Sequence, residues 1–166
     1  MFYFEILEGL YKNKVKYLLV GGLSVNLYGV PRVTQDVDII ISMDKENILK
    51  TTSLLIKLDY VPRLPVNPDD LADLEKVKDW VENRNLKAFS FYHKRDNYKV
   101  VDILLVHPLD FNKAFKNKTA KKVKEIEIYL VSIADLIATK EFSGREQDIS
   151  DINMLKRMSK YLMEEK

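Results

Sequence analysis

The chain has 166 residues, 46% of them hydrophobic and 31% charged, which is an ordinary composition for a soluble globular protein. A formal net charge of +2 predicts no strong general field for nucleic acid or a membrane. The absence of cysteine excludes disulfides, thiolate zinc sites and cysteine nucleophiles. The N-terminal segment lacks the pattern of a secretory signal, and no apolar run reaches the roughly 20 residues of a membrane helix. We therefore expect a cytoplasmic protein without membrane contact.

The N-terminal half alternates between helical and strand patterns. Helices are predicted where apolar residues recur every three or four positions, and strands where β-branched and other apolar residues form short runs. Asp44 is a suitable N-cap for one of these helices. In chain order the expected elements are helix 2–11, strand 16–20, helix 24–28, strand 36–42 and helix 45–58.

The C-terminal half continues in the same way and ends in helices. A run of lysines between residues 113 and 124 is more typical of a solvated loop and strand edge than of a nucleic-acid patch. Ser132 is expected to cap the penultimate helix and Gly144 to lie at its C-terminal end. The expected elements are helix 71–81, strands 86–92, 99–106 and 122–131, helix 132–140 and a last helix around 152–162.

This order of elements predicts one α/β (α+β) domain over residues 1–166. Its core, at about 15–131, would be a mixed β-sheet flanked by helices. Its C-terminal part, at about 132–166, would be helical.

Two aspartates lie two residues apart on the strand expected at 36–42. Side chains at this spacing point to the same face, so Asp36 and Asp38 project together. Two neighbouring carboxylates repel each other, and a hard divalent cation such as Mg²⁺ removes the repulsion. A solvated strand end, where paired aspartates cost little, explains this pair equally well when it is taken alone.

A third aspartate favours the metal interpretation. Asp102 lies within the apolar run VVDILLV, where a lone carboxylate is costly unless it is paired or bound to metal. Carboxylates from two strands could hold two metal ions, one to activate a hydroxyl and one to bind a nucleotide triphosphate.

The expected turn at Gly21 and Gly22 adds a candidate phosphate site, since glycines let backbone amides approach a phosphate closely. Ser24 is a candidate hydroxyl donor, and Arg32 a cation that stabilises phosphate charge. A double glycine alone is weak support. It is far more specific when it precedes the pattern Arg-x-Thr-x-Asp-x-Asp, which includes Thr34.

The stretch VGGLSVNLYGVPRVTQDVDIII resembles the signature of the nucleotidyltransferase superfamily, which includes DNA polymerase β and the CCA-adding enzymes. It is more similar still to the bacterial branch of AbiEii-like toxins and minimal nucleotidyltransferases. The resemblance covers about residues 15–106. It implies that Asp36 and Asp38 are paired metal ligands and Asp102 the third carboxylate. Many members have serine directly after glycine, whereas here Leu23 comes first.

The segment LIATKEFSGREQDISDINML also resembles the AbiEii-like branch, in which a helical lysine precedes a turn and helix rich in arginine and aspartate. Lys140 could reach a nucleotide phosphate, or its stem could cover the edge of the core with equal probability. Arg145, Asp148 and Asp151 could orient this lysine or cap the last helix, and capping is the favoured role for Asp148. Neither His93 nor His107 pairs with a second candidate metal ligand.

Three functions are compatible with these patterns. The favoured one is an enzyme that uses Mg²⁺ or Mn²⁺ to transfer a nucleoside monophosphate from an NTP to an acceptor hydroxyl. The acceptor would be RNA, a protein side chain or a small molecule, and the enzyme could belong to a toxin–antitoxin system. The alternatives are a non-catalytic nucleotide-binding or regulatory module on the same fold, and an antitoxin-like protein that contacts a partner from a neighbouring gene.

Overall fold

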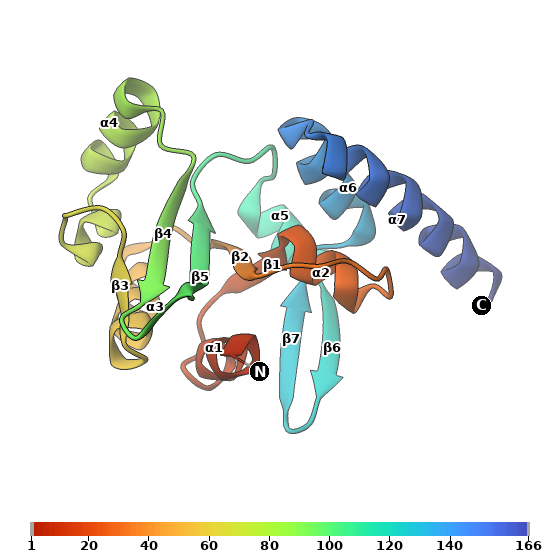
Figure 1. Ribbon diagram of the computed structural model, residues 1–166, viewed down its shortest axis with the longest axis horizontal. Coiled ribbons are helices and arrows are strands. Elements are labelled where there is room, and N and C mark those ends of the chain that lie inside the picture. Colours follow the sequence, from red (N-terminus) through yellow and green to blue (C-terminus); the bar gives the residue numbers. More distant parts are fainter. Residues whose placement is uncertain (1, 166) are drawn as a thin grey trace.

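A computed structural model describes residues 2–165, which form a mixed sheet with helices packed around it (Figure 1). The helices are α1 (Phe2–Lys12), α2 (Gly21–Leu27), α3 (Lys45–Lys57), the 3₁₀ helix η1 (Pro68–Ala72), α4 (Leu74–Arg84), α5 (Phe111–Lys116), α6 (Ile133–Ser143) and α7 (Glu146–Glu164). The strands are β1 (Tyr17–Val20), β2 (Asp36–Ile41), β3 (Tyr60–Pro62), β4 (Ala88–His93), β5 (Asp96–Leu104), β6 (Thr119–Val123) and β7 (Ile126–Leu130).

The described strands form one seven-stranded sheet in the order β3-β4-β5-β2-β1-β7-β6. The pairs β2–β5 and β1–β7 are parallel, and the other neighbouring pairs are antiparallel. The central strand is therefore β2, with β5 on one side and β1 on the other. A mixed sheet flanked by helices, with a helical C-terminus, is the expected fold class and is confirmed.

Strand β2 follows the alternation that its sequence predicts. Val37, Ile39 and Ile41 are at most 3% exposed and belong to the core, which anchors the strand. The intervening Asp36 and Asp38 project from the opposite face at the beginning of the strand. Burial of the apolar face thus fixes the register, because a slip of one residue would bury the aspartates and expose the core residues.

Most predicted helices are present, and their capping residues are confirmed. The side chain of Asp44 accepts a hydrogen bond from the backbone N–H of Asn47 at the start of α3. Ser132 caps α6 through the N–H of Asp135, and Gly144 ends that helix in the left-handed conformation. The last helix is longer than its apolar spacing indicates, since α7 begins directly after Arg145.

Three sequence expectations are wrong in detail. Gly21 and Gly22 are not a turn before a helix but its first residues, because α2 begins directly after β1. The single strand expected over 122–131 is the hairpin β6–β7, which turns at Lys124 in a left-handed conformation. The lysine-rich run includes the edge strand β6, as expected, but its first part belongs to the helix α5 and not to a loop. Charged residues interrupt the apolar pattern in both places and hide the elements.

The segment between α3 and α4 also differs from the prediction. The proline-rich stretch after α3 contains the short strand β3 and the helix η1, and α4 begins only at Leu74. Proline is tolerated at the end of an edge strand and in the first turn of a helix, so these residues delimit elements without preventing them.

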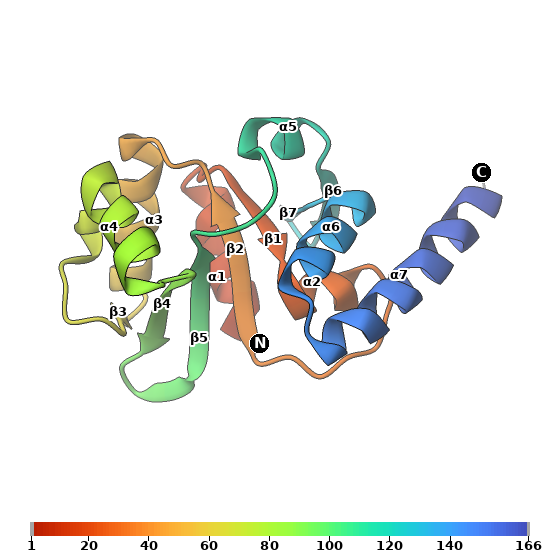
Figure 2. The same cartoon turned by 90° about the horizontal axis from the view of Figure 1, so that it is seen from above.

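The two C-terminal helices cover the sheet beside α2, and the second half of α7 extends beyond the rest of the chain (Figures 1 and 2). Leu155, from the first half of α7, is fully buried in the core. None of the helices formed by residues 2–165 is both long and apolar enough to cross a membrane.

A buried tyrosine links α2 to the hairpin. The hydroxyl of Tyr28 donates to the carbonyl oxygen of Val131 at 2.6 Å and lies 2.8 Å from Oγ1 of Thr119. Tyr28→Phe should lower the free energy of unfolding by about 1–2 kcal/mol, because the buried carbonyl loses its donor. Urea denaturation measures the change, with Tyr98→Phe, at a side chain that is 78% exposed, as the control that should have no effect. Equal stability of both variants would contradict the proposed link.

Candidate active site

Three carboxylates meet where β2 and β5 run side by side. These strands are parallel, and Asp38 is the direct cross-strand partner of Asp102. Asp36 lies two residues before Asp38 on the same face of β2. The structure therefore brings the three sequence-predicted aspartates together on one face of the sheet.

These aspartates form part of the lining of a cavity of about 530 Å³, a volume within the usual range for small-molecule sites. Its lining also includes the start of α2, the loop before β2, the end of β5 with the residues after it, and α6. From these elements come Gly21, Gly22, Arg32, Thr34, Val106, His107, Thr139, Lys140 and Phe142. Lys87, just before β4, and Arg145, just before α7, complete this part of the lining. Backbone, cationic and apolar groups thus surround the carboxylates.

The three carboxylates are partly buried and repel one another. Burial, together with the neighbouring charges of Asp102 and Asp36, raises the pKa of Asp38 to about 6, although Lys140 and Arg145 oppose the shift. Burial and the charge of Asp102 also raise the pKa of Asp36. Oδ1 of Asp102 is buried and has no hydrogen-bond partner among the described residues. Negative charge is therefore costly here until a positive ligand arrives.

The two glycines of α2 are required by close packing against this site. Gly21 has a φ of +68°, and a Cβ atom there would overlap Oδ2 of Asp38. A Cβ atom at Gly22 would overlap the guanidinium of Arg32 and lie 2.8 Å from Oγ1 of Thr34. Val20, the residue before them, is the cross-strand partner of Asp38, which explains why the helix begins so close to the carboxylates.

The carboxylates do not form a closed metal cage. Among residues 2–165, no group of three or more His, Asp or Glu side chains is arranged so that it could hold a metal ion by itself. The donors are nevertheless oxygen atoms, which Mg²⁺ prefers, and Mg²⁺ is commonly held by one or two carboxylates together with substrate phosphates. The unpartnered Oδ1 of Asp102 and the raised pKa of Asp38 fit a cation shared with a substrate.

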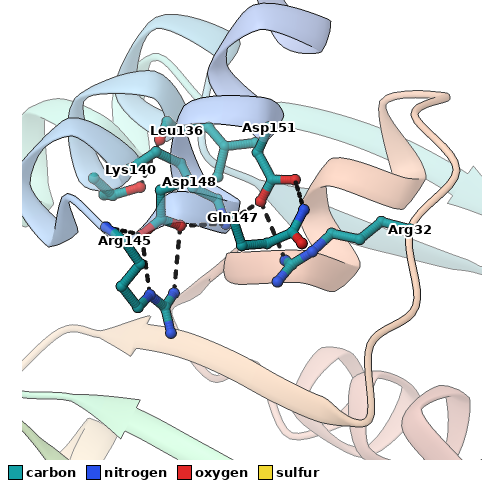
Figure 3. Close-up of polar contacts among 8 residues, drawn as sticks. Arg32, Leu136, Lys140, Arg145, Gln147, Asp148 and Asp151 are labelled. Carbon is teal, nitrogen blue, oxygen red and sulfur yellow. Dashed lines mark hydrogen bonds and ion pairs between the residues drawn. The ribbon is translucent and has the colours of Figure 1, made fainter.

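Lys140 lines the cavity, but its ammonium is held by two carboxylates. Its side chain is 3% exposed, and Nζ lies 2.8 Å from Oδ2 of Asp151 and 3.2 Å from Oδ1 of Asp148 (Figure 3). The structure thus favours neither of the two roles expected for it, since the ammonium is held in a buried ion-pair network between α6 and α7. From there its charge still acts on Asp38.

Asp148 has the capping role that its position predicts. Its Oδ2 accepts a hydrogen bond from the backbone N–H of Arg145 at 3.1 Å, at the start of α7. Burial alone would raise the pKa of Asp148, but hydrogen bonds from Arg145 and Ser143 and the charge of Lys140 lower it to about 2. It remains ionised and neutralises part of the positive charge of Lys140.

The predicted phosphate-binding residues are placed differently from one another. Arg32 and Thr34 line the cavity beside Gly22, and Nη1 of Arg32 also lies 3.3 Å from Oδ2 of Asp151. Ser24 is fully buried and is not part of the lining, so its expected contact with phosphate has no support in the structure. The extra residue, Leu23, separates this serine from the glycines.

Sequence reasoning missed several polar residues of the lining, among them His107 and Lys87. His107 lies just after β5, and burial lowers its pKa. Its Nδ1 accepts from the N–H of Leu109 at 3.3 Å, so the neutral ring carries its proton on Nε2. Lys87 precedes β4, and its backbone oxygen accepts from Leu105 at 2.9 Å. Their distance from the aspartate motif in sequence hid them, although both flank strand ends next to Asp102.

A family comparison agrees with this geometry. Residues 4–161 match the family described as "Nucleotidyltransferase of unknown function (DUF6036)". The chain belongs to this nucleotidyltransferase family. Among curated proteins, no sequence matches the chain.

Solved nucleotidyltransferase structures share the fold. The lincosamide antibiotic adenylyltransferase LnuA, bound to lincomycin, aligns with a TM-score of 0.61 at 21% identity, over 94% of this chain and 95% of its own. ANT(2'')-Ia in complex with adenylyl-2''-tobramycin aligns at 0.57 and 9% identity, over 93% and 85%. An antigenic nucleotidyltransferase-like protein from Paracoccidioides brasiliensis aligns at 0.53 and 18% identity, over 90% and 71%. At these identities the likeness concerns the fold alone.

The crowded carboxylates of this nucleotidyltransferase should make its stability depend on pH. The pKa of Asp38 is about 6 in the folded protein and about 3.9 in an unfolded chain, so the folded state binds this proton more tightly. The resulting stabilisation is complete below about pH 4 and is lost as the pH rises through about 6. Without divalent cations, the free energy of unfolding should therefore fall across this window, by on the order of 1–3 kcal/mol more than in Asp38→Asn.

Chemical denaturation at several pH values, with a chelator present, measures this difference. Subtracting the Asp38→Asn curve removes the contributions of carboxyl groups that do not interact with Asp38. Asp148, whose pKa is about 2, has its effect at lower pH. If the free energy of unfolding changes equally with pH in the parent and the variant between pH 4 and pH 6, the pKa of Asp38 is not raised by folding.

Proposed function

We propose that the protein transfers a nucleoside monophosphate from an NTP to an acceptor hydroxyl and releases pyrophosphate, with Mg²⁺ or Mn²⁺ as cofactor. The observation that carries this proposal is the convergence of Asp36, Asp38 and Asp102 in a cavity that also contains Arg32 and backbone glycines. The family to which the chain belongs supports nucleotide transfer in general.

The carboxylates would hold the metal. Asp36 and Asp38 are assigned as its paired ligands and Asp102 as the third, with triphosphate oxygens completing the coordination. When bound, the divalent cation supplies positive charge that neutralises the triphosphate and lowers the pKa of an attacking hydroxyl.

The protein groups around the carboxylates have complementary roles in this proposal. Gly21 and Gly22 present backbone without side chains, which lets a phosphate approach closely. Arg32 supplies a guanidinium, and Thr34 a hydroxyl, on the same side of the cavity. Asp102 would orient the acceptor hydroxyl and accept its proton, and the lack of a partner for its Oδ1 among the described residues supports this role. Charge developing on the phosphate would be stabilised by Arg32 and, at longer range, by Lys140.

The acceptor remains open among RNA, a protein side chain and a small molecule. Two structurally similar proteins are solved with lincomycin and with adenylyl-2''-tobramycin, which are small molecules. The cavity volume of about 530 Å³ is compatible with a nucleotide and part of a small acceptor. The resemblance to the AbiEii-like branch suggests instead a role in a toxin–antitoxin system, together with a partner protein from a neighbouring gene.

The double substitution Asp36→Asn with Asp38→Asn tests the proposal. Transfer of label from NTPs to cell RNA, lysate protein or small-molecule extracts should fall by at least about 10²–10³-fold, because the ligands that align the triphosphate are lost. The fold should survive, since mutual repulsion between the carboxylates is relieved. Thermal unfolding in the presence of NTP and Mg²⁺ should show a stabilised parent and an unresponsive double variant.

Asp79→Asn is the matched control, because Asp79 lies on α4 in a surface ion pair with Arg84 and does not line the cavity. It should retain the parent's activity. A double variant as active as the parent would refute the catalytic assignment. A parent that binds no NTP at millimolar concentration with metal present would contradict the proposal as well.

A further inference from the structure

The last helix reaches the site through one carboxylate oxygen. Oδ2 of Asp151, on α7, lies 2.8 Å from Nζ of Lys140 on α6 and 3.3 Å from Nη1 of Arg32 in the loop before β2 (Figure 3). The other oxygen, Oδ1, accepts a hydrogen bond from Nε2 of Gln147 at 3.1 Å. One buried oxygen thus joins two helices and the loop.

This arrangement is costly unless every charge is matched. The side chains of Asp151 and Lys140 are each 3% exposed, and that of Asp148 is fully buried. Buried ion pairs contribute little net stability, whereas removal of one partner leaves a buried charge without compensation. A network of this kind is therefore more informative about the placement of its members than about the stability of the fold.

Arg32 is the member that faces the proposed substrate. Its side chain is 19% exposed and lines the cavity, and its guanidinium packs directly over Gly22. Its Nε is buried and has no hydrogen-bond partner in the described part of the chain. The guanidinium is thus only partly committed to Asp151, and its remaining donors are available for an anion.

The loop that carries Arg32 has no regular structure of its own. Residues 30–35 connect α2 to β2 without helix or strand, and Asp36 follows them directly. The ion pair with Asp151 is the salt bridge that ties this loop to α7. Without it, the guanidinium would be free to leave its position over Gly22.

We propose that Asp151 is a positioning residue, which holds Arg32 over Gly22 so that its guanidinium meets the triphosphate. Lys140 is its buried counterpart, because its ammonium balances the second charge of the Asp148–Asp151 pair. The inference rests on the proposed function, since it assigns Arg32 to the NTP. It also explains why the ammonium of Lys140 lies in the network.

The test compares Asp151→Asn with Gln147→Ala. Both changes affect contacts of the same carboxylate, but only the first removes the charge that holds Arg32, because Gln147 is exposed and contacts the opposite oxygen. Two readouts are used: hydrogen–deuterium exchange of residues 30–35 without ligand, and the Kd for a non-hydrolysable ATP analogue with Mg²⁺, by titration calorimetry.

Asp151→Asn should speed exchange in the loop and raise the Kd by about tenfold or more, as expected for a misplaced charge-assisted hydrogen bond. Gln147→Ala should change neither. Arg32→Gln should weaken binding similarly, and the double variant with Asp151→Asn should bind no more weakly than Arg32→Gln alone, because both remove one interaction. If Asp151→Asn does not fold, Asp151→Glu keeps the charge, displaces the oxygens and should give a smaller change in the same direction.

The possible results separate the two proposals. A folded Asp151→Asn protein with the parent's loop exchange and the parent's Kd would overturn the positioning role, as would additive effects of the two substitutions. A parent that binds the analogue but transfers no nucleotide would contradict only the proposed function. A parent that binds no nucleotide would overturn both.

Discussion

The site depends on one constraint, namely that carboxylates from two parallel strands are held in register before any cation is present. Asp38 and Asp102 are direct partners on β2 and β5, and the apolar faces of these strands are buried in the core. The core therefore buries the charges and forces them together, and the free-energy cost of this burial and crowding appears as the raised pKa of Asp38. A ligand that brings positive charge would release it, which links the stability of the fold to the proposed chemistry.

The remaining elements supply charge of the opposite sign without closing the site. Helix α2 begins at a glycine because any side chain there would collide with Asp38. Arg32 lies beside this glycine. The carboxylates of Asp148 and Asp151 hold the ammonium of Lys140, and Asp151 also holds the guanidinium of Arg32. Carboxylates and cationic side chains that line one cavity suit a metal-bound triphosphate. The register of the strands places the carboxylates, whereas contacts between α6, α7 and the loop before β2 place the cationic side chains.

The carboxylates could be predicted from the sequence because strand periodicity determines their positions. The spacing of Asp36 and Asp38, and the apolar surroundings of Asp102, are local properties that can be read directly. The arrangement of the cationic side chains could not be predicted from the sequence in this way. The partnership of Asp151 with Arg32 joins residues more than 100 positions apart, and the burial of Ser24 depends on a helix that begins three residues earlier than expected. His107 and Lys87 come together only when β4 and β5 pair.

The most direct test of the proposed site is whether its carboxylates hold a metal together with a nucleotide. Electron paramagnetic resonance of Mn²⁺, with a non-hydrolysable ATP analogue, compares the metal bound by the parent and by Asp38→Asn at equal protein concentration. The parent should bind Mn²⁺ well only when the analogue is present, because the carboxylates do not form a complete cage. The variant should bind little more than the analogue does in buffer. Equal binding by parent and variant would contradict the assignment of this site.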